Sequence, residues 1–190
     1  MKDALGILAV VIGFIGYVPY FQTIFSGKTK PHAFTWLVWG TLTAIATAGQ
    51  VAGGGGAGAW VTGFTALISF IIFGLALVRG VKDFPLSDWL CLAGCILAAV
   101  LWLVTDDPLT AVLLVTIIDA VAFIPTIRKS YSKPNSEPVF TYAMSGLKFV
   151  IGILALQQLS LITVLYPASL VLANGGFVIM LWVRKRSLNK

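Results

Sequence analysis

Two ionisable residues stand in the middle of long apolar runs, and their chemistry is the first indication of what this chain does. Asp119 lies near the centre of the apolar segment 109–129, and Lys148 lies near the centre of 139–157. A charged side chain at the middle of a bilayer costs about 2.5–3.5 kcal/mol, so neither should face lipid. We expect the carboxylate and the ammonium to pair between consecutive helices, because pairing offsets most of that cost.

The segments that must position these residues belong to a chain that is apolar throughout. Of its 190 residues, 58% are hydrophobic and 11% are charged, whereas about 25% of the residues of a soluble domain are charged. A helix needs about 20 apolar residues to cross the hydrocarbon layer. The predicted fold class is therefore an all-α integral membrane protein with seven transmembrane helices, at 4–25, 32–52, 58–79, 86–105, 109–129, 139–157 and 160–183. We expect the first to be retained, because no small-x-small cleavage site follows it.

The basic residues predict the orientation of these helices. Eleven of the 13 Lys and Arg residues lie in alternate loops or in the C-terminal tail, whereas the loops VAGGGGAG, TDDPLT and LQQLS contain none. The positive-inside rule places the basic loops in the cytoplasm. The expected location is the cell (inner) membrane, with the N-terminus outside and the C-terminus cytoplasmic. Topology therefore explains the net charge of +6, and no nucleic acid is expected as a partner.

A weak internal repeat divides the chain. A shift of 106 residues aligns 16–40 with 122–146 without a gap and pairs Pro19 with Pro125. Each copy contains an apolar helix with a proline, a basic loop and a new helix that opens on Phe-Thr. We predict two parallel three-helix repeats, related by an axis along the membrane normal and joined by a linker helix. The predicted units are 1–81, 82–106 and 107–190.

The charged pair occurs in only one of these repeats. The positions 106 residues before Asp119 and Lys148 are Gly13 and Leu42. A pair that served only to hold two helices together is one interpretation; a site that binds a polar solute or exchanges a proton is the other. The missing counterpart favours the binding site, because folding of the repeat does not require the pair.

Three further residues complete the predicted substrate-binding set. Asn174 in LANGGFV offers an amide at a similar depth, either to a solute or to a neighbouring helix. Trp39 can stack on a ring of a solute or pack against the first helix. Its counterpart in the second repeat is Ser145, and a small residue opposite a large one leaves room for a ligand.

Three stretches resemble the PQ-loop superfamily. VPYFQTIFSGKTK at 18–30 and FIPTIRKSYSKPNS at 123–136 are similar to the family's Pro-Gln helix end and Lys-Ser loop, and ANGG at 173–176 is similar to its last helix. The 3+1+3 layout resembles the SWEET transporters, to which the half-size SemiSWEETs and the PnuC-type vitamin transporters are related. The resemblance implies a solute site between two three-helix bundles, with Asn174 in its lining.

The resemblance also assigns a role to the prolines. It implies that Pro19 and Pro125 let their helices bend as the cytoplasmic gate opens and closes. A proline removes one intrahelical hydrogen bond and clashes with the preceding turn, which favours a hinge. The alternative is a static kink, since prolines are common in membrane helices.

These observations predict a transporter and not an enzyme. Its partners are the bilayer and a small-molecule substrate, either sugar-like or vitamin- or amino-acid-like. No catalytic constellation or metal site is expected: His32 is the single histidine, and Cys91 and Cys95 are interpreted as small packing residues. No cofactor is expected either. Movement is either facilitated diffusion or proton coupled through Asp119.

One alternative belongs to another functional class. The same bundle could serve a non-transporting receptor or assembly factor that acts through its cytoplasmic loops, with 128–136 as the binding segment. The sequence leaves the identity of the solute and the formation of a homo-oligomer open.

Overall fold

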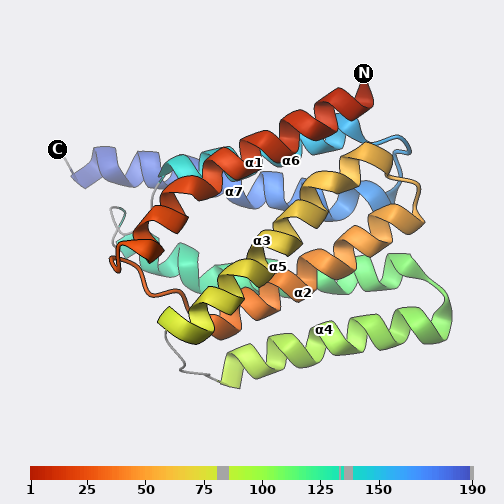
Figure 1. Cartoon of the computed structure of the whole chain (residues 1–190), viewed down its shortest axis with the longest axis horizontal. Coiled ribbons are helices and arrows are strands. Elements are labelled where there is room, and N and C mark those ends of the chain that lie inside the picture. Colours follow the sequence, from red (N-terminus) through yellow and green to blue (C-terminus); the bar gives the residue numbers. More distant parts are fainter. Residues whose placement is uncertain (81–85, 133, 135–138, 189–190) are drawn as a thin grey trace.

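The computed structural model describes residues 1–80, 86–132, 134 and 139–188, which form helices and turns with no strand among them (Figure 1). The helices are α1 (Lys2–Phe25), α2 (Ala33–Ala52), the 3-10 helix η1 (Gly56–Ala59), α3 (Trp60–Arg79), α4 (Leu86–Thr105), α5 (Pro108–Ser132), α6 (Val139–Ala155) and α7 (Leu161–Leu188). Each predicted apolar segment therefore coincides with a helix, and the all-α class is confirmed.

Four of the described helical segments are long and apolar enough to cross a membrane. They are α1, η1 together with α3, α5, and α7 as far as Ser187, while α4 and α6 contain shorter apolar stretches. The remaining helix, α2, carries four threonines and Gln50 along its length. It packs against α3, α4, α5 and α7, so its polar side chains meet protein on most sides.

The largest apolar core surrounds α2. Leu42 and Ala46 of α2 pack with Val112 of α5, Cys95 of α4 and Tyr166 of α7, all of them buried. In Figure 1, α4 lies along one edge of the bundle, and α1 and α6 lie at the opposite edge. The interpretation of Cys95 as a packing residue is confirmed, because its thiol is free and fully enclosed.

Polar residues set the first turns of two helices. His32 precedes α2, and its Nδ1 accepts a hydrogen bond from the backbone N–H of Thr35 at 3.3 Å. Asp107 precedes α5: its Oδ2 accepts from Thr110 Oγ1 at 2.6 Å, and its Oδ1 accepts from the N–H of Leu109 at 3.0 Å. These bonds favour the ionised carboxylate and lower the pKa of Asp107 below its ordinary value.

Hydrogen bonds join the turn between α2 and α3 to the turn between α6 and α7. The N–H of Gln157 donates to the carbonyl of Gly55 at 3.0 Å. Gln50 Nε2 donates to the carbonyl of Thr163 at 2.9 Å, and the ammonium of Lys2 donates to a carbonyl of the same α6–α7 turn. This end of the bundle is therefore tied together across segments that are far apart in sequence.

Candidate solute site between α1 and α6

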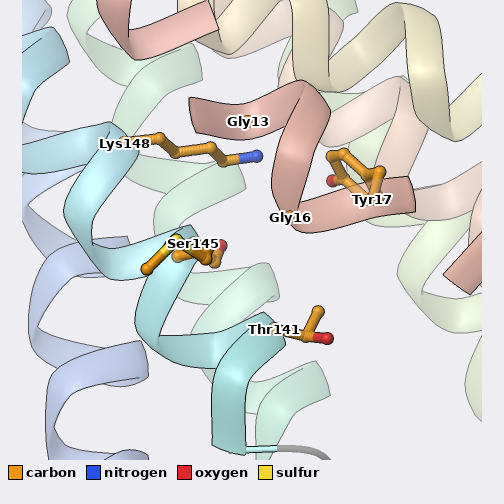
Figure 2. A pocket seen from close by; sticks show the side chains of 7 residues that line it. Gly13, Gly16, Tyr17, Thr141, Ser145 and Lys148 are labelled. Atoms are coloured by element: carbon orange, nitrogen blue, oxygen red, sulfur yellow. The ribbon is translucent and has the colours of Figure 1, made fainter. Parts of the chain in front are cut away.

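A small cavity lies between α1 and α6 (Figure 2). It is partly open, has a volume of about 50 Å³ and is lined by Gly13, Gly16 and Tyr17 of α1 and by Thr141, Met144, Ser145 and Lys148 of α6. Thr141, Ser145 and Lys148 follow the spacing that places side chains on one face of a helix. The volume is enough for at least one water molecule. Figure 2 shows the Lys148 side chain extending from α6 toward α1.

Two glycines of α1 make this arrangement possible. A Cβ atom at Gly16 would lie 3.1 Å from the Cβ of Met144, and one at Gly13 would lie 3.2 Å from the Cδ of Lys148. Both distances are shorter than ordinary carbon contacts. Glycine therefore lets α1 approach α6 closely and leaves a channel for the lysine side chain.

Lys148 is buried, with 2% of its surface exposed. Its Nζ donates to Thr65 Oγ1 at 2.9 Å, and that hydroxyl donates in turn to the carbonyl of Val61 at 2.7 Å. Its Nζ also lies 4.7 Å from the ring centre of Tyr17 and 4.8 Å from that of Phe149. Cation–π contacts of this kind stabilise a desolvated ammonium by about 2 kcal/mol.

The ion pair expected between Asp119 and Lys148 is wrong for this structure. Neither side chain forms an ion pair within the described ranges, and Lys148 bonds to Thr65 instead. The reason lies in helix neighbours: α6 packs mainly against α1 and α7, while α5 packs against α4, α7 and α2. Although α5 and α6 are consecutive in sequence, Asp119 and Lys148 therefore face mostly different neighbouring helices.

Asp119 has an environment of its own. Tyr166 of α7 and Cys95 of α4 are ionisable side chains near it. Both partners are buried, and no cation pairs with Asp119 among the residues that the structure describes. The acid and the base of the predicted pair therefore do not pair with each other, although Tyr166 lies near both Asp119 and Tyr17.

The structure brings together two of the five residues predicted to bind solute. Lys148 and Ser145 line the same cavity. Asn174 is buried and its Nδ2 donates at 2.7 Å to a carbonyl one turn earlier in α7. The ring of Trp39 lies edge-on to that of Trp36, 5.3 Å away, and packs against the core around α2. Solute contacts by Asn174, Trp39 and Asp119 stay predictions.

The proline hinges are untested by this geometry. Pro19 is exposed inside α1, which continues beyond it to Phe25. Position 125 lies within α5, but the side chain of Pro125 is outside the described part of the chain. The predicted bending of these helices at the prolines therefore stays a prediction.

The sequence reasoning missed Thr65 and Tyr17 as partners of Lys148. Thr65 is a polar residue in the apolar run of α3, and such residues are candidates for contacts to buried charges. Tyr17 was visible as an aromatic residue between two glycines and a proline. What the sequence did not reveal was that α1 and α3 both face Lys148.

Comparison of the chain with protein-family models, with curated proteins and with solved structures found no match. The resemblance to the PQ-loop superfamily accordingly stays a prediction made from the sequence.

Proposed function

We propose that this protein is a membrane carrier that moves a small polar solute by alternating access, with its solute site between α1 and α6. The observation that carries the proposal is the buried ammonium of Lys148 beside a cavity, in a bundle of long apolar helices. A buried cationic group is costly, and intramembrane ionisable residues commonly mark solute or ion pathways.

The surface of the bundle supports a place in the bilayer. Large apolar side chains lie exposed along several helices, including Phe14 of α1, Leu67 of α3 and Leu103 of α4. Exposed apolar surface of this extent is unfavourable in water and suits lipid. With the basic loops on the cytoplasmic side, the N-terminus lies outside and the C-terminus inside the cell membrane.

Helix neighbours support the two-bundle arrangement. α3 packs against α1 and α2, and α7 packs against α5 and α6. Between these sets, α1 packs against α6 and α2 packs against α5. If α1, α2 and α3 are exchanged with α5, α6 and α7 in that order, each of these contacts maps onto another of them. Such symmetry is expected for parallel repeats at 1–81 and 107–190 joined by a linker helix. These contacts support the 3+1+3 layout that we propose for this chain, which resembles that of the SWEET carriers.

The hydrogen bonds at one end of the bundle indicate which conformation of the proposed transport cycle this arrangement corresponds to. They join the α2–α3 turn to the α6–α7 turn and the last turn of α2 to the first turn of α7, all on the side proposed as outside. The cavity extends from Lys148 to Thr141, near the start of α6, which is the proposed cytoplasmic end. We assign this arrangement to a carrier closed to the outside, whose inner gate moves about Pro19 and Pro125.

Asp119 is the group proposed to bind a proton if transport is proton coupled. It lies in α5 without a cationic partner among the described residues, close to Tyr166 and Cys95. A carrier without coupling would exchange solute at a rate that is independent of pH. Counterflow measured at several pH values, with wild type and Asp119→Asn, separates the two mechanisms.

Counterflow in proteoliposomes tests the carrier function itself. The solutes are sugars, nucleosides, amino acids and short-chain carboxylates, each offered in labelled form against an internal pool of the same compound. Gly16→Leu fills the cavity from α1, whereas a Cβ at Gly74 of α3 would meet nothing within 4 Å, so Gly74→Leu is the matched control. We expect counterflow of one solute class that Gly16→Leu abolishes and Gly74→Leu retains.

Two results would contradict the proposal. Absence of counterflow for every class, with protein that is folded and inserted, would favour a receptor or an assembly factor. Counterflow that is retained in the Gly16→Leu variant would show that the solute does not pass between α1 and α6.

A further inference from the structure

We infer that the cavity between α1 and α6 is an anion site, and that the solute of the proposed carrier is a small monocarboxylate held by Lys148. The identification of the anion as transported solute rests on the proposed function, while the anion site itself does not. Three features of the described residues carry the inference: unused donors, net charge and volume.

The first feature is the set of donors on the ammonium. A protonated lysine has three N–H donors and no acceptor. Lys148 Nζ has one hydrogen-bond partner in the described part of the chain, Thr65 Oγ1, whose own proton is given to the carbonyl of Val61. The rings of Tyr17 and Phe149 attract the charge but provide no lone pair. Two donors therefore have no partner among the described residues, Lys148 lines the cavity, and a carboxylate has two oxygens that can accept hydrogen bonds.

The second feature is the charge of the site. The other residues that line the cavity are glycines, a tyrosine, a threonine, a methionine and a serine, and the contacts from α3 come from Thr65 and Phe64. None of these is acidic. A monoanion would neutralise Lys148, whereas a neutral sugar would leave its charge uncompensated and a dianion such as phosphate would leave an excess negative charge. A buried amine without a counter-charge tends to lose its proton, so a bound monoanion would keep Lys148 in its charged form.

The third feature is the size of the cavity. The cavity is partly open and has a volume of about 50 Å³, and about 10–15 Å³ on the same measure holds one water molecule. The space therefore suits a few non-hydrogen atoms. The Met144 side chain and the Tyr17 ring give it an apolar wall beside Lys148, and Ser145 adds a hydroxyl. A carboxylate with a short carbon chain matches this combination.

A titration of purified protein with propionate and with propionamide tests the inference. The two compounds have nearly the same shape, but only propionate carries a charge. We expect propionate to raise the melting temperature in a saturable manner and to give binding heat by calorimetry, and propionamide to do neither. Phosphate at the same concentration is expected to bind more weakly than propionate.

Substitutions then locate the site. Lys148→Met should weaken propionate binding roughly 30-fold or more, because it removes the charge that pairs with the anion. Lys148→Arg keeps the charge and should retain part of the affinity. Lys28 is exposed between α1 and α2, so Lys28→Met is the matched control and should bind as wild type does. Ser145→Trp keeps the lysine but fills the cavity and should also abolish binding.

The outcomes separate failure of this inference from failure of the carrier proposal. Equal binding of propionate and propionamide, or wild-type affinity in folded Lys148→Met, would overturn the anion site. Binding of propionate without counterflow in proteoliposomes would leave the anion site in place and reject the carrier. Counterflow of a neutral solute that Lys148→Met does not affect would retain the carrier and reject the monocarboxylate.

Discussion

The interface between α1 and α6 is polar and contains a cavity, whereas the interface between α2 and α5 is apolar and closely packed. Between α1 and α6 lie glycines, hydroxyl side chains, a buried lysine and a cavity of about 50 Å³. Between α2 and α5, Leu42 and Ala46 pack directly against Val112 and Val115. A Cβ at Gly49 of α2 would lie only 2.5 Å from Cγ2 of Val112, so this second interface is closely packed.

Residues 106 positions apart in sequence explain the difference. Where α6 has Lys148, α2 has Leu42, and where α6 has the small Ser145, α2 has Trp39. Gly13 of α1 leaves space beside Lys148, whereas Asp119 stands at the corresponding position of α5. Two interfaces with the same pairing of helices thus differ by a few side chains, one of them suited to binding and the other to stability.

The largest expected effect comes from truncation in the packed interface. Leu42 is fully buried, so Leu42→Ala should lower the free energy of unfolding by about 3 kcal/mol through lost contacts and the cavity left behind. Leu97 of α4 is 54% exposed, and Leu97→Ala is the control with an expected loss well under half as large. Reversible unfolding in detergent measures both. Equal losses would show that the α2–α5 contact is not a stabilising core.

In the polar interface the sign of the effect should reverse. Lys148→Met keeps most of the length of the side chain and removes a buried ammonium that has a single hydrogen-bond partner in the described residues. We expect the ligand-free protein to become more stable by about 1–2 kcal/mol. A marked loss of stability in the same unfolding assay would mean that Lys148 serves the fold rather than a ligand.

A smaller effect is expected where α2 meets the α6–α7 turn. Gln50→Ala removes the hydrogen bond to the carbonyl of Thr163 and should cost about 1 kcal/mol. If the bond also closes the outer end, a cysteine introduced at Gln157 should react faster with an impermeant maleimide in this variant. Unchanged labelling would indicate that the turn is held closed by other contacts.

The smallest effect concerns Asp107, outside both interfaces. Hydrogen bonds from Thr110 and Leu109 lower its pKa below the ordinary value of 3.8. The ionised carboxylate therefore stabilises the native state fully above pH 3.8, and this contribution is lost as the pH falls through the lower native pKa. The melting temperature of Asp107→Ala should lie below that of wild type at neutral pH and converge with it in acid. A difference that is constant with pH would contradict the cap.

Much of the secondary structure was predictable because its causes are local. Apolar runs of about 20 residues favour helices whatever surrounds them. Histidine or aspartate before a helix caps it through atoms only three residues away, as His32 and Asp107 do. Lys148 and Ser145 were also identifiable, since a charge in an apolar run needs a polar environment and a small residue leaves space.

The error over Asp119 shows where local reasoning stops. Consecutive helices were expected to be neighbours, but α6 lies mainly against α1 and α7. Thr65 and Tyr17 contact Lys148 from helices that are distant in sequence. Nothing in the spacing of 139–157 shows which of the six other helices its polar face meets.

The sequence alone determined that this chain forms apolar helices, approximately where they lie, and which few polar residues must be shielded inside them, because all of these depend on side-chain chemistry and short-range hydrogen bonds. Only the tertiary structure decided that Lys148 meets Thr65 and Tyr17 beside a cavity while Asp119 lies apart. That choice depends on how glycines such as Gly13 and Gly16 let two helices approach, which is a property of the packed bundle and of no single segment.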